Sequence, residues 1–318
     1  MDGRVETKGR LPDFIIGGAP KCGTTSVHFL LGSSPEIGIP DDEVHFFDAD
    51  DPIAHPDFLH AGRGGLDWYD PDTPEGLDWY RGRFAALADR PLVGEDSTLY
   101  LHSPVAPERI ARVLPDAKLI FMLRDPVRRA CSQYWHMVTR GRAVCGLETA
   151  LSRHPNLILC STYLAPLRRY LDLFGPERVR VCLFEDFLAD RQGVMDGLCA
   201  FLGAAPLRVG HEDGWHNRTF YPSNPRLQLL LNRISRRIAA RQYRNHFDAD
   251  RTPRAALRAR MHRRWFRHAH PVLLTATRAP PVAEETASYL RRHLSDRNRG
   301  LSDLLGRDLS QVWPGFEG

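Results

Sequence analysis

A glycine loop with a lysine inside it follows the first apolar run of the chain. Phe14-Ile15-Ile16 leads into Gly18-Ala-Pro-Lys21-Cys22-Gly23-Thr24-Thr25-Ser26, after which apolar residues recur at helical spacing. This order predicts a strand, a loop and a helix whose first amides bind an anionic group such as a phosphate. A Walker A loop has lysine directly after its last glycine, where this chain has Thr24. We therefore expect Lys21 to lie over a group that is transferred.

Lysine is rare in this chain. Only three of its 43 basic residues are lysine, namely Lys8, Lys21 and Lys118. An ammonium and a guanidinium differ in shape and hydration, so a lysine in the glycine loop indicates a role that arginine cannot fill. The arginine bias also indicates a GC-rich, bacterial genome.

A second polar segment follows an apolar run at Lys118–Leu123, which suits a buried parallel strand. Asp125-Pro126 then has the form of an N-cap and a first-turn proline, and Ser132 lies about two turns into the helix. Arg124 stands at the carboxyl end of the strand, the edge where such sheets bind ligands. Arg124 and Ser132 therefore predict a second phosphate site, and two separate sites fit a nucleotide phosphorylated at both its 3′ and 5′ positions.

Strands alternate with helices over residues 12–205. Besides those above, we expect strands at Leu92-Val93 and Arg178–Phe184, and helices at Pro107–Leu114 and Tyr163–Phe174. The alternation predicts right-handed βαβ units in a P-loop three-layer αβα fold with a mostly parallel sheet. Residues 206–318 are expected to be mainly helical, and residues 1–318 to form a single domain.

The composition excludes several classes of protein. With 42% hydrophobic and 26% charged residues among 318, the chain can bury one sizeable core. No run reaches the ~20 apolar residues of a membrane span, and the polar start lacks the apolar part of a signal peptide. We therefore expect a cytoplasmic protein without a transmembrane segment. The six cysteines have no CxxC spacing or histidine partners at zinc spacing, so no metal site is expected.

The motifs together resemble those of the sulfotransferases that use 3′-phosphoadenosine-5′-phosphosulfate (PAPS), in particular the heparan-sulfate glucosaminyl 3-O- and N-sulfotransferases. The two phosphate motifs read P-K-x-G-T-T-S from Pro20 and L-R-D-P-x-x-R-x-x-S-x-Y from Leu123. Glu43–Asp48 resembles the family's E-V-H-F-F-D element, and Glu95–Tyr100 its E-K-[ST]-x-x-Y segment. Leu301–Trp313 looks like its leucine-rich ending. The resemblance is good over about residues 12–205 and patchy beyond them.

The resemblance implies transfer of a sulfuryl group from PAPS to an acceptor hydroxyl, with no metal required. The residues that would bind the 5′-phosphosulfate are Lys21, Cys22, Gly23, Thr24, Thr25 and Ser26. Arg124 and Ser132 would bind the 3′-phosphate. Glu43 matches the catalytic base, which takes the acceptor proton, while Lys21 would stabilise charge on the leaving oxygen. His45 would orient the acceptor, act as an alternative base or fill an aromatic cluster. The acceptor implied is a glycan or a small molecule.

The chain departs from the family pattern at two places. The lysine of the E-K-[ST] segment is Asp96 here, so a second catalytic lysine is missing. The family's late lysine-glycine loop, which binds the cofactor, has no clear match. Asn217–Tyr221 is the best substitute, with Arg218 as the candidate contact.

Two other functions fit parts of the sequence. A P-loop kinase would use ATP and Mg²⁺, but the missing Walker lysine and the Arg124 and Ser132 pair disfavour it. A nucleic-acid-binding protein is suggested by residues 226–267, which hold 13 arginines and two acids. This segment also has an apolar stripe, formed by Leu227, Leu230, Ile234 and Ile238. The stripe predicts that the arginines face solvent, so no nucleic-acid partner is expected.

Overall fold

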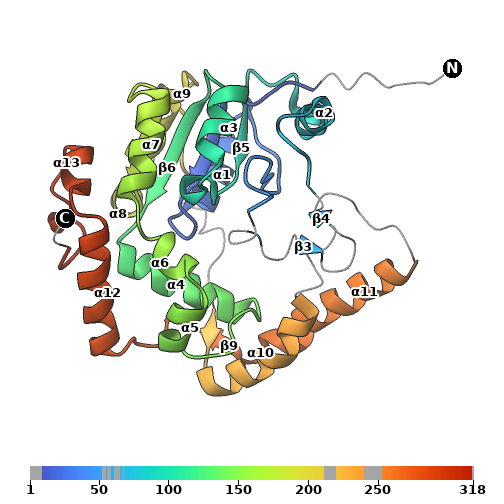
Figure 1. Cartoon of the computed structure of the whole chain (residues 1–318), viewed down its shortest axis with the longest axis vertical. Helices are drawn as coiled ribbons and strands as arrows, with labels where there is room; N and C mark the ends of the chain where they lie inside the picture. Colours follow the sequence, from blue (N-terminus) through green and yellow to red (C-terminus); the bar gives the residue numbers. More distant parts are fainter. Residues whose placement is uncertain are drawn as a thin grey trace.

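A five-stranded sheet in the order β2-β5-β1-β6-β7 forms the centre of the computed structural model (Figure 1). The structure describes residues 9–51, 55, 59–60, 65–66, 68–210, 220–239 and 253–316. The strands of the sheet are β1 (Phe14–Gly18), β2 (Ile37–Gly38), β5 (Leu92–Asp96), β6 (Lys118–Leu123) and β7 (Val179–Leu183). The helices are α1 (Thr24–Gly32), α2 (Pro74–Gly82), α3 (Ala106–Val113), α4 (Pro126–Thr139), α5 (Leu147–Arg153), α6 (Asn156–Leu159), α7 (Leu164–Phe174), α8 (Phe184–Ala189), α9 (Arg191–Leu202), α10 (Pro225–Ala239), α11 (Pro253–Arg264), α12 (Glu284–Arg297) and α13 (Leu301–Leu305). Every strand pairing in the sheet is parallel, which confirms the predicted α/β class.

Helices cover both faces of the sheet. Successive side chains of a strand point to opposite faces, so residues 118 and 121 of β6 face opposite ways. The Lys118 ammonium donates to the carbonyl of Phe201 in α9 at 2.6 Å. The Phe121 ring lies against Tyr170 of α7, with 4.8 Å between ring centroids. Helices α9 and α7 therefore lie on opposite faces, where α1 contacts α9 and α3 contacts α7, and the predicted three layers are confirmed.

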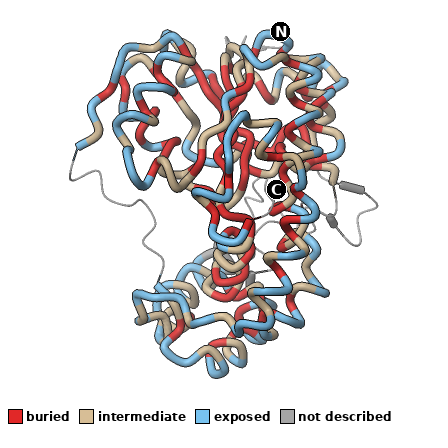
Figure 2. The backbone as a smooth tube through the Cα atoms, turned by 90° about the vertical axis from the view of Figure 1, so that its left-hand side faces the viewer, coloured by how far each residue is buried: buried red, intermediate tan, exposed pale blue. Residues whose placement is uncertain are grey.

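The core follows the sheet. Both central strands are apolar throughout their interiors because a parallel strand covered on both faces has no solvent-facing side. The buried hydrophobic side chains of β1 and β6 are Phe14, Ile15, Ile16, Leu119, Ile120, Phe121, Met122 and Leu123. A smaller cluster surrounds α4 and α5, with Tyr134, Trp135, Val138, Ala143, Leu147, Ala150 and Leu157. Figure 2 shows buried residues running from the sheet into this smaller helical part.

Residues from the last part of the chain pack into the main core. Asn298 accepts a hydrogen bond from the Tyr163 amide at 2.7 Å and donates to the Ser161 carbonyl at 2.9 Å. Trp313 is fully buried, and its indole Nε1 donates to a carboxylate oxygen of Glu185 at 3.0 Å. Buried hydrogen bonds thus join the last part of the chain, which the sequence predicts to be mainly helical, to the α/β part.

Helix α10 differs from its prediction in the face that it buries. Its arginines are exposed, as expected, but so are Leu227, Leu230 and Ile234 of the apolar stripe. The buried face instead carries Gln228, Asn232 and Ser235. Polar side chains can be buried when they find partners, and the Asn232 amide donates to the carbonyls of Val138 and Ala143 at 2.8 and 2.7 Å.

Candidate active site

The glycine loop between β1 and α1 has a backbone that only glycine permits at two positions. Gly23 has φ 92°, and a Cβ there would lie 2.6 Å from the Phe184 ring. Gly18 has φ 146°, and a Cβ there would lie 2.7 Å from the Thr98 carbonyl oxygen. No acceptor is found for the amides of Thr24 and Thr25 among the described backbone bonds, whereas the Ser26 amide donates to the Gly23 carbonyl at 3.0 Å. Unpaired amides at the start of a helix can bind an anion.

Lys21 and His136 meet across this loop. Lys21 Nζ lies 3.2 Å from Nδ1 of His136 on α4. Burial, followed by the charges of Lys21 and Arg140, holds the His136 pKa well below its ordinary value, so the ring is neutral and accepts from the ammonium. Burial, followed by Arg140 and Arg124, lowers the Lys21 pKa to about 8. The loop cation therefore has a neutral acceptor that orients it without cancelling its charge.

One face of α4 turns toward the loop. Arg129, Ser132 and His136 are three and four residues apart, so they share that face. Arg129 is fully buried, donating to the Ser161 hydroxyl at 2.6 Å and to the Pro20 carbonyl at 3.5 Å. Ser132 is half-buried between Arg129 and His136. The helix therefore brings the predicted serine to the side of the loop.

Arg124 lies beside the loop as well. Its guanidinium donates to the Lys21 carbonyl at 3.3 Å and stacks on the Phe184 ring, with 4.8 Å from Cζ to the ring centroid. Within the described part of the chain it forms no ion pair with a carboxylate. An arginine held by an aromatic ring and a carbonyl keeps donors available for a phosphate.

Glu43 is hydrogen-bonded to Thr98, the residue whose carbonyl adjoins Gly18 of the loop, and both of its carboxylate oxygens have partners. Oε1 accepts from the Thr98 hydroxyl at 2.8 Å, and Oε2 lies 2.7 Å from His45 Nε2. Burial alone raises the Glu43 pKa, but the hydrogen bonds from His45 and Thr98 outweigh it and hold the pKa below its ordinary value. Burial alone lowers the His45 pKa, yet Asp48 and Glu43 hold it well above its ordinary value. At neutral pH, Glu43 is therefore a carboxylate and His45 an imidazolium.

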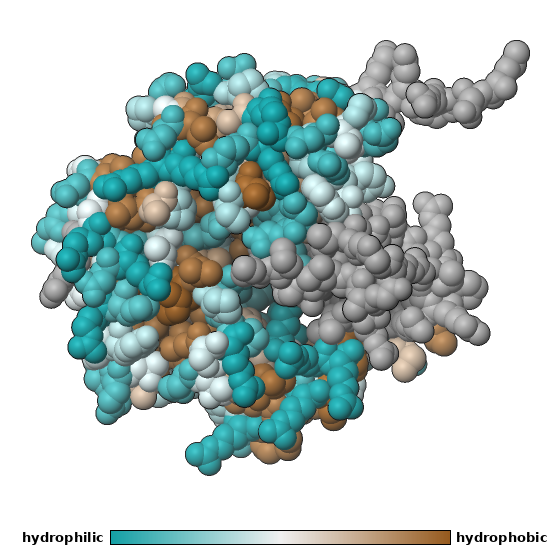
Figure 3. Space-filling model, in the orientation of Figure 1, coloured by the Kyte–Doolittle hydropathy of each residue, from teal (hydrophilic) through white to brown (hydrophobic). Residues whose placement is uncertain are grey.

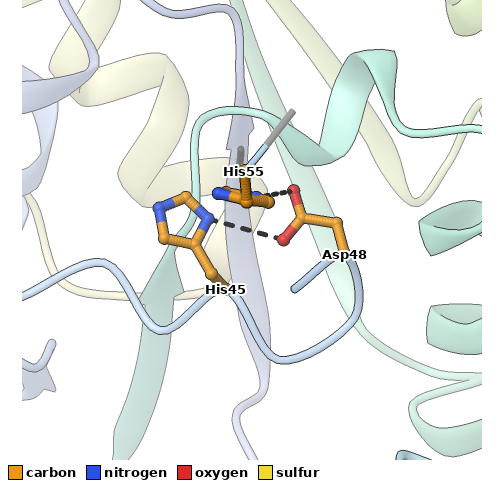
Figure 4. A group of neighbouring side chains, drawn as sticks. All are labelled: His45, Asp48 and His55. Atoms are coloured by element: carbon orange, nitrogen blue, oxygen red, sulfur yellow. Dashed lines mark ion pairs between the residues drawn. The ribbon is translucent and has the colours of Figure 1, made fainter. Parts of the chain in front are cut away.

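His45, Asp48 and His55 form a buried cluster next to Glu43 (Figure 4). Asp48 Oδ1 lies 3.5 Å from His45 Nδ1, and Asp48 Oδ2 lies 3.0 Å from His55 Nε2. The cluster offers one donor atom from each residue, all within 4.8 Å of one another, which is a set that could hold a transition metal. The pairing of one carboxylate with two imidazoles also accounts for this arrangement without an ion.

The E-x-S-x-x-Y segment positions the loop that carries Glu43 and His45. The Ser97 hydroxyl accepts from the His45 amide at 2.9 Å and donates to Glu95 at 2.7 Å. The Tyr100 hydroxyl accepts from the Phe47 amide at 3.2 Å and donates to the same Glu95 oxygen at 2.6 Å. Burial raises the Glu95 pKa to about 7. The motif therefore fixes the backbone behind the candidate base.

Asp96, which takes the place of the family's lysine, is paired with a histidine. Its Oδ2 lies 3.2 Å from Nδ1 of His28 on α1, and both side chains are buried. Burial raises the Asp96 pKa to about 6, despite the neighbouring His28. An Asp96–His28 pair therefore stands where the sulfotransferases that the sequence resembles have a lysine.

The structure brings together most of the residues that the sequence singled out. Arg124 contacts Lys21 in the loop, and Glu43 and His45 lie next to each other. Ser132 precedes His136, which contacts Lys21, by one helical turn on the same face of α4. Arg218 falls outside the described residues. Sequence reasoning missed His136, His55 and Asp96's partner His28. For His136 a signal existed, because it follows Ser132 by four residues on one helix.

The fold and the loop first define a class. A parallel sheet whose first strand passes through a glycine loop into α1, with a half-buried lysine in the loop, is the architecture of the P-loop α/β proteins. Within that class the chain belongs to the sulfotransferase family, whose family model matches residues 12–206.

Individual relatives agree with this family. The chain is 27% identical over 225 residues to the human bifunctional heparan sulfate N-deacetylase/N-sulfotransferase 2. The aligned segment covers 64% of the chain and 23% of that protein. A sulfotransferase structure from Alicyclobacillus acidocaldarius is 31% identical with a TM-score of 0.51, covering 75% of the chain and 97% of that structure. The membrane-associated sulfotransferase kil1 of Dictyostelium discoideum is 30% identical over 127 residues, which is 39% of the chain and 22% of that protein. The chain thus spans less than a quarter of these two curated relatives.

Proposed function

We propose that the chain transfers a sulfuryl group from PAPS to an acceptor hydroxyl. The observation that carries the proposal is the placement of a cation and a carboxylate around one loop. Lys21 is a half-buried ammonium in the loop, and the Glu43 charge partly offsets the lowering of the Lys21 pKa by burial, Arg140 and Arg124. In-line transfer needs a cation at the leaving oxygen and a base at the attacking hydroxyl.

Each residue then has a distinct part. The amides at the start of α1 bind the 5′-phosphosulfate, and Lys21 stabilises the negative charge that grows on the oxygen leaving sulfur. Glu43 accepts the acceptor's proton as its oxygen bonds to sulfur. His45, already protonated, orients Glu43, and its raised pKa disfavours the alternative in which His45 is the base.

The 3′-phosphate is assigned to Arg124 and Ser132. Arg124 keeps guanidinium donors beside the loop, and Ser132 lies on the α4 face that the loop contacts. A phosphate there would complete a pair of anion sites on either side of Lys21. Arg218 stays a predicted contact to the donor.

The acceptor is proposed to be a hydroxyl of a glycan or a small molecule. Relatives named for heparan sulfate N-sulfotransfer make a sugar acceptor the first to test. Incubation with labelled PAPS and extracts of the host, followed by mass analysis of the sulfated product, identifies it.

Nucleotide binding tests the proposal directly. A ligand stabilises the fold according to its affinity, so 3′-phosphoadenosine 5′-phosphate should raise the melting temperature far more than ADP at equal concentration. Equal shifts would overturn the assignment of two phosphate sites. Turnover with PAPS should also survive excess EDTA, and a strict need for Mg²⁺ would favour a kinase instead.

A further inference from the structure

Helix α10 exposes an apolar stripe that the fold does not use. Leu227, Leu230 and Ile234 are 51%, 56% and 53% exposed, and they follow one another at helical spacing along one side. In α11, Leu257 and Met261 are 58% and 64% exposed. Figure 3 shows hydrophobic side chains among strongly hydrophilic ones along the lower edge of the molecule, where Figure 1 places α10.

The orientation of α10 is fixed by hydrogen bonds on its other side, so its apolar stripe stays exposed. Asn232 bonds two carbonyls at the end of α4. Ser235 contacts His270 Nδ1 at 2.9 Å and accepts from the Trp265 indole at 2.8 Å. Rotating the helix to bury its leucines would break these bonds and leave buried polar groups unpaired. The fold therefore presents the apolar side outward.

The charges beside the stripe are all of one sign. Helices α10 and α11 contain nine arginines and no aspartate or glutamate. The arginines whose exposure is described are Arg226, Arg233, Arg236, Arg237, Arg260, Arg263 and Arg264, and all of them are exposed. A second copy packed on this side would bring arginines against arginines. A partner that accepts both the leucines and the positive charge has an apolar interior and an anionic surface.

We propose that the α10 and α11 face docks on an anionic phospholipid membrane. Leu227, Leu230 and Ile234 would enter the boundary between headgroups and acyl chains, while the arginines reach back to the phosphates. No described helix is long and apolar enough to cross a membrane. The proposal does not depend on sulfuryl transfer.

Co-sedimentation of the full chain with vesicles tests this docking. The protein should bind vesicles of phosphatidylcholine with phosphatidylglycerol, and bind phosphatidylcholine alone far more weakly. Leu230→Gln with Ile234→Gln leaves the charge unchanged and should weaken binding by at least about tenfold. Arg233→Gln with Arg237→Gln should weaken it roughly fivefold per arginine, and less so at high salt. Leu173→Gln, at an exposed leucine of α7, is the matched control and should have no effect.

Three results would overturn the docking proposal. The first is no sedimentation with anionic vesicles. The second is equal vesicle binding by the parent and the Leu230→Gln/Ile234→Gln variant at an unchanged melting temperature. That result would mean that the apolar stripe does not enter the membrane and that binding is electrostatic alone. The third is a dimer in light scattering that this variant dissociates, which would assign the face to a second copy.

Discussion

Lys21 is a cation that its surroundings orient without neutralising it. Its ammonium contacts a histidine that burial and neighbouring cations keep neutral, so the lysine is oriented but not neutralised. An arginine at this place would keep its charge at every pH, whereas a lysine with a lowered pKa titrates near the working range.

The protonation of Lys21 predicts how kcat/KM for PAPS depends on pH. Its pKa is lowered to about 8, so the protonated form prevails below that pH and is lost above it. We expect kcat/KM for PAPS to fall as the pH rises through about 8. Lys21→Arg should be impaired at neutral pH because a broad planar group must fit the loop, but its profile should lack this alkaline limb. A limb at the same pH in Lys21→Arg would assign it to another group.

Substitution of Glu43 is expected to lower turnover without weakening PAPS binding. Glu43→Gln keeps the size of the side chain but removes the base, so turnover should fall by ~10² or more while PAPS affinity persists. Steady-state kinetics together with calorimetric PAPS titration measures both. Asp42→Asn, at the exposed neighbouring acid, is the control and should turn over like the parent. Parental turnover by Glu43→Gln would place the base elsewhere.

Arg124 is expected to act on binding alone. Its proposed partner, the 3′-phosphate, is remote from sulfur, and loss of a charged hydrogen bond costs ~1.5–3 kcal/mol, or about 10- to 150-fold in affinity. Arg124→Ala should therefore raise the Kd for 3′-phosphoadenosine 5′-phosphate by such a factor. Arg128→Ala, at an exposed arginine in the first turn of α4, should leave this Kd unchanged.

At the scale of elements, local signals in the sequence predicted the pieces that carry the site. Asp125 and Pro126 mark the start of α4 without reference to the rest of the fold, and the Asp125 carboxylate does accept from the Arg128 amide at 2.9 Å. The glycine loop was equally local. Strand β2 was missed because two residues carry no periodicity of their own. They become a strand only by pairing with β5.

The parts of the candidate site that the sequence did not predict depend on contacts between distant segments. His136 is 115 residues from Lys21, and His28 meets Asp96 only because the fold brings this side chain of α1 to the last residue of β5. The exposure of the apolar side of α10 was not predicted, for a similar reason. Hydropathy alone favours burying its leucines, but the carbonyls at the end of α4 accept Asn232 instead.

Asn298 tests how firmly the segment after α12 is attached. It satisfies the buried Tyr163 amide and the Ser161 carbonyl. Asn298→Leu would leave both groups unpaired, at ~1–3 kcal/mol each, so unfolding in urea should show a loss of about 2–5 kcal/mol. Arg292→Ala, on the exposed side of α12, should change stability little.

At the scale of the molecule, the main core includes side chains from both parts of the chain. Leu301, Leu309, Trp313 and Phe316 belong to the same cluster as the strands of the sheet. We therefore expect removal of residues 284–318 to abolish folding rather than release an independent α/β domain. Circular dichroism and thermal melting check this. A soluble truncated protein with a cooperative transition would show that the rest of the chain folds without residues 284–318.

The bond between Trp313 and Glu185 also bears on the order in which the protein assembles. Glu185 holds the Trp313 indole with one oxygen and the Asp125 amide with the other, at 3.0 and 3.1 Å. The two partners of the first bond are 128 residues apart, so the entropy of closing that loop is lost before the contact forms. Neighbouring βαβ units close much shorter loops and can form earlier. Glu185, whose other oxygen holds the segment that leads from Arg124 into α4, gains its Trp313 partner only when the leucine-rich ending has docked. We therefore expect the packing around the proposed 3′-phosphate site to be completed late in refolding.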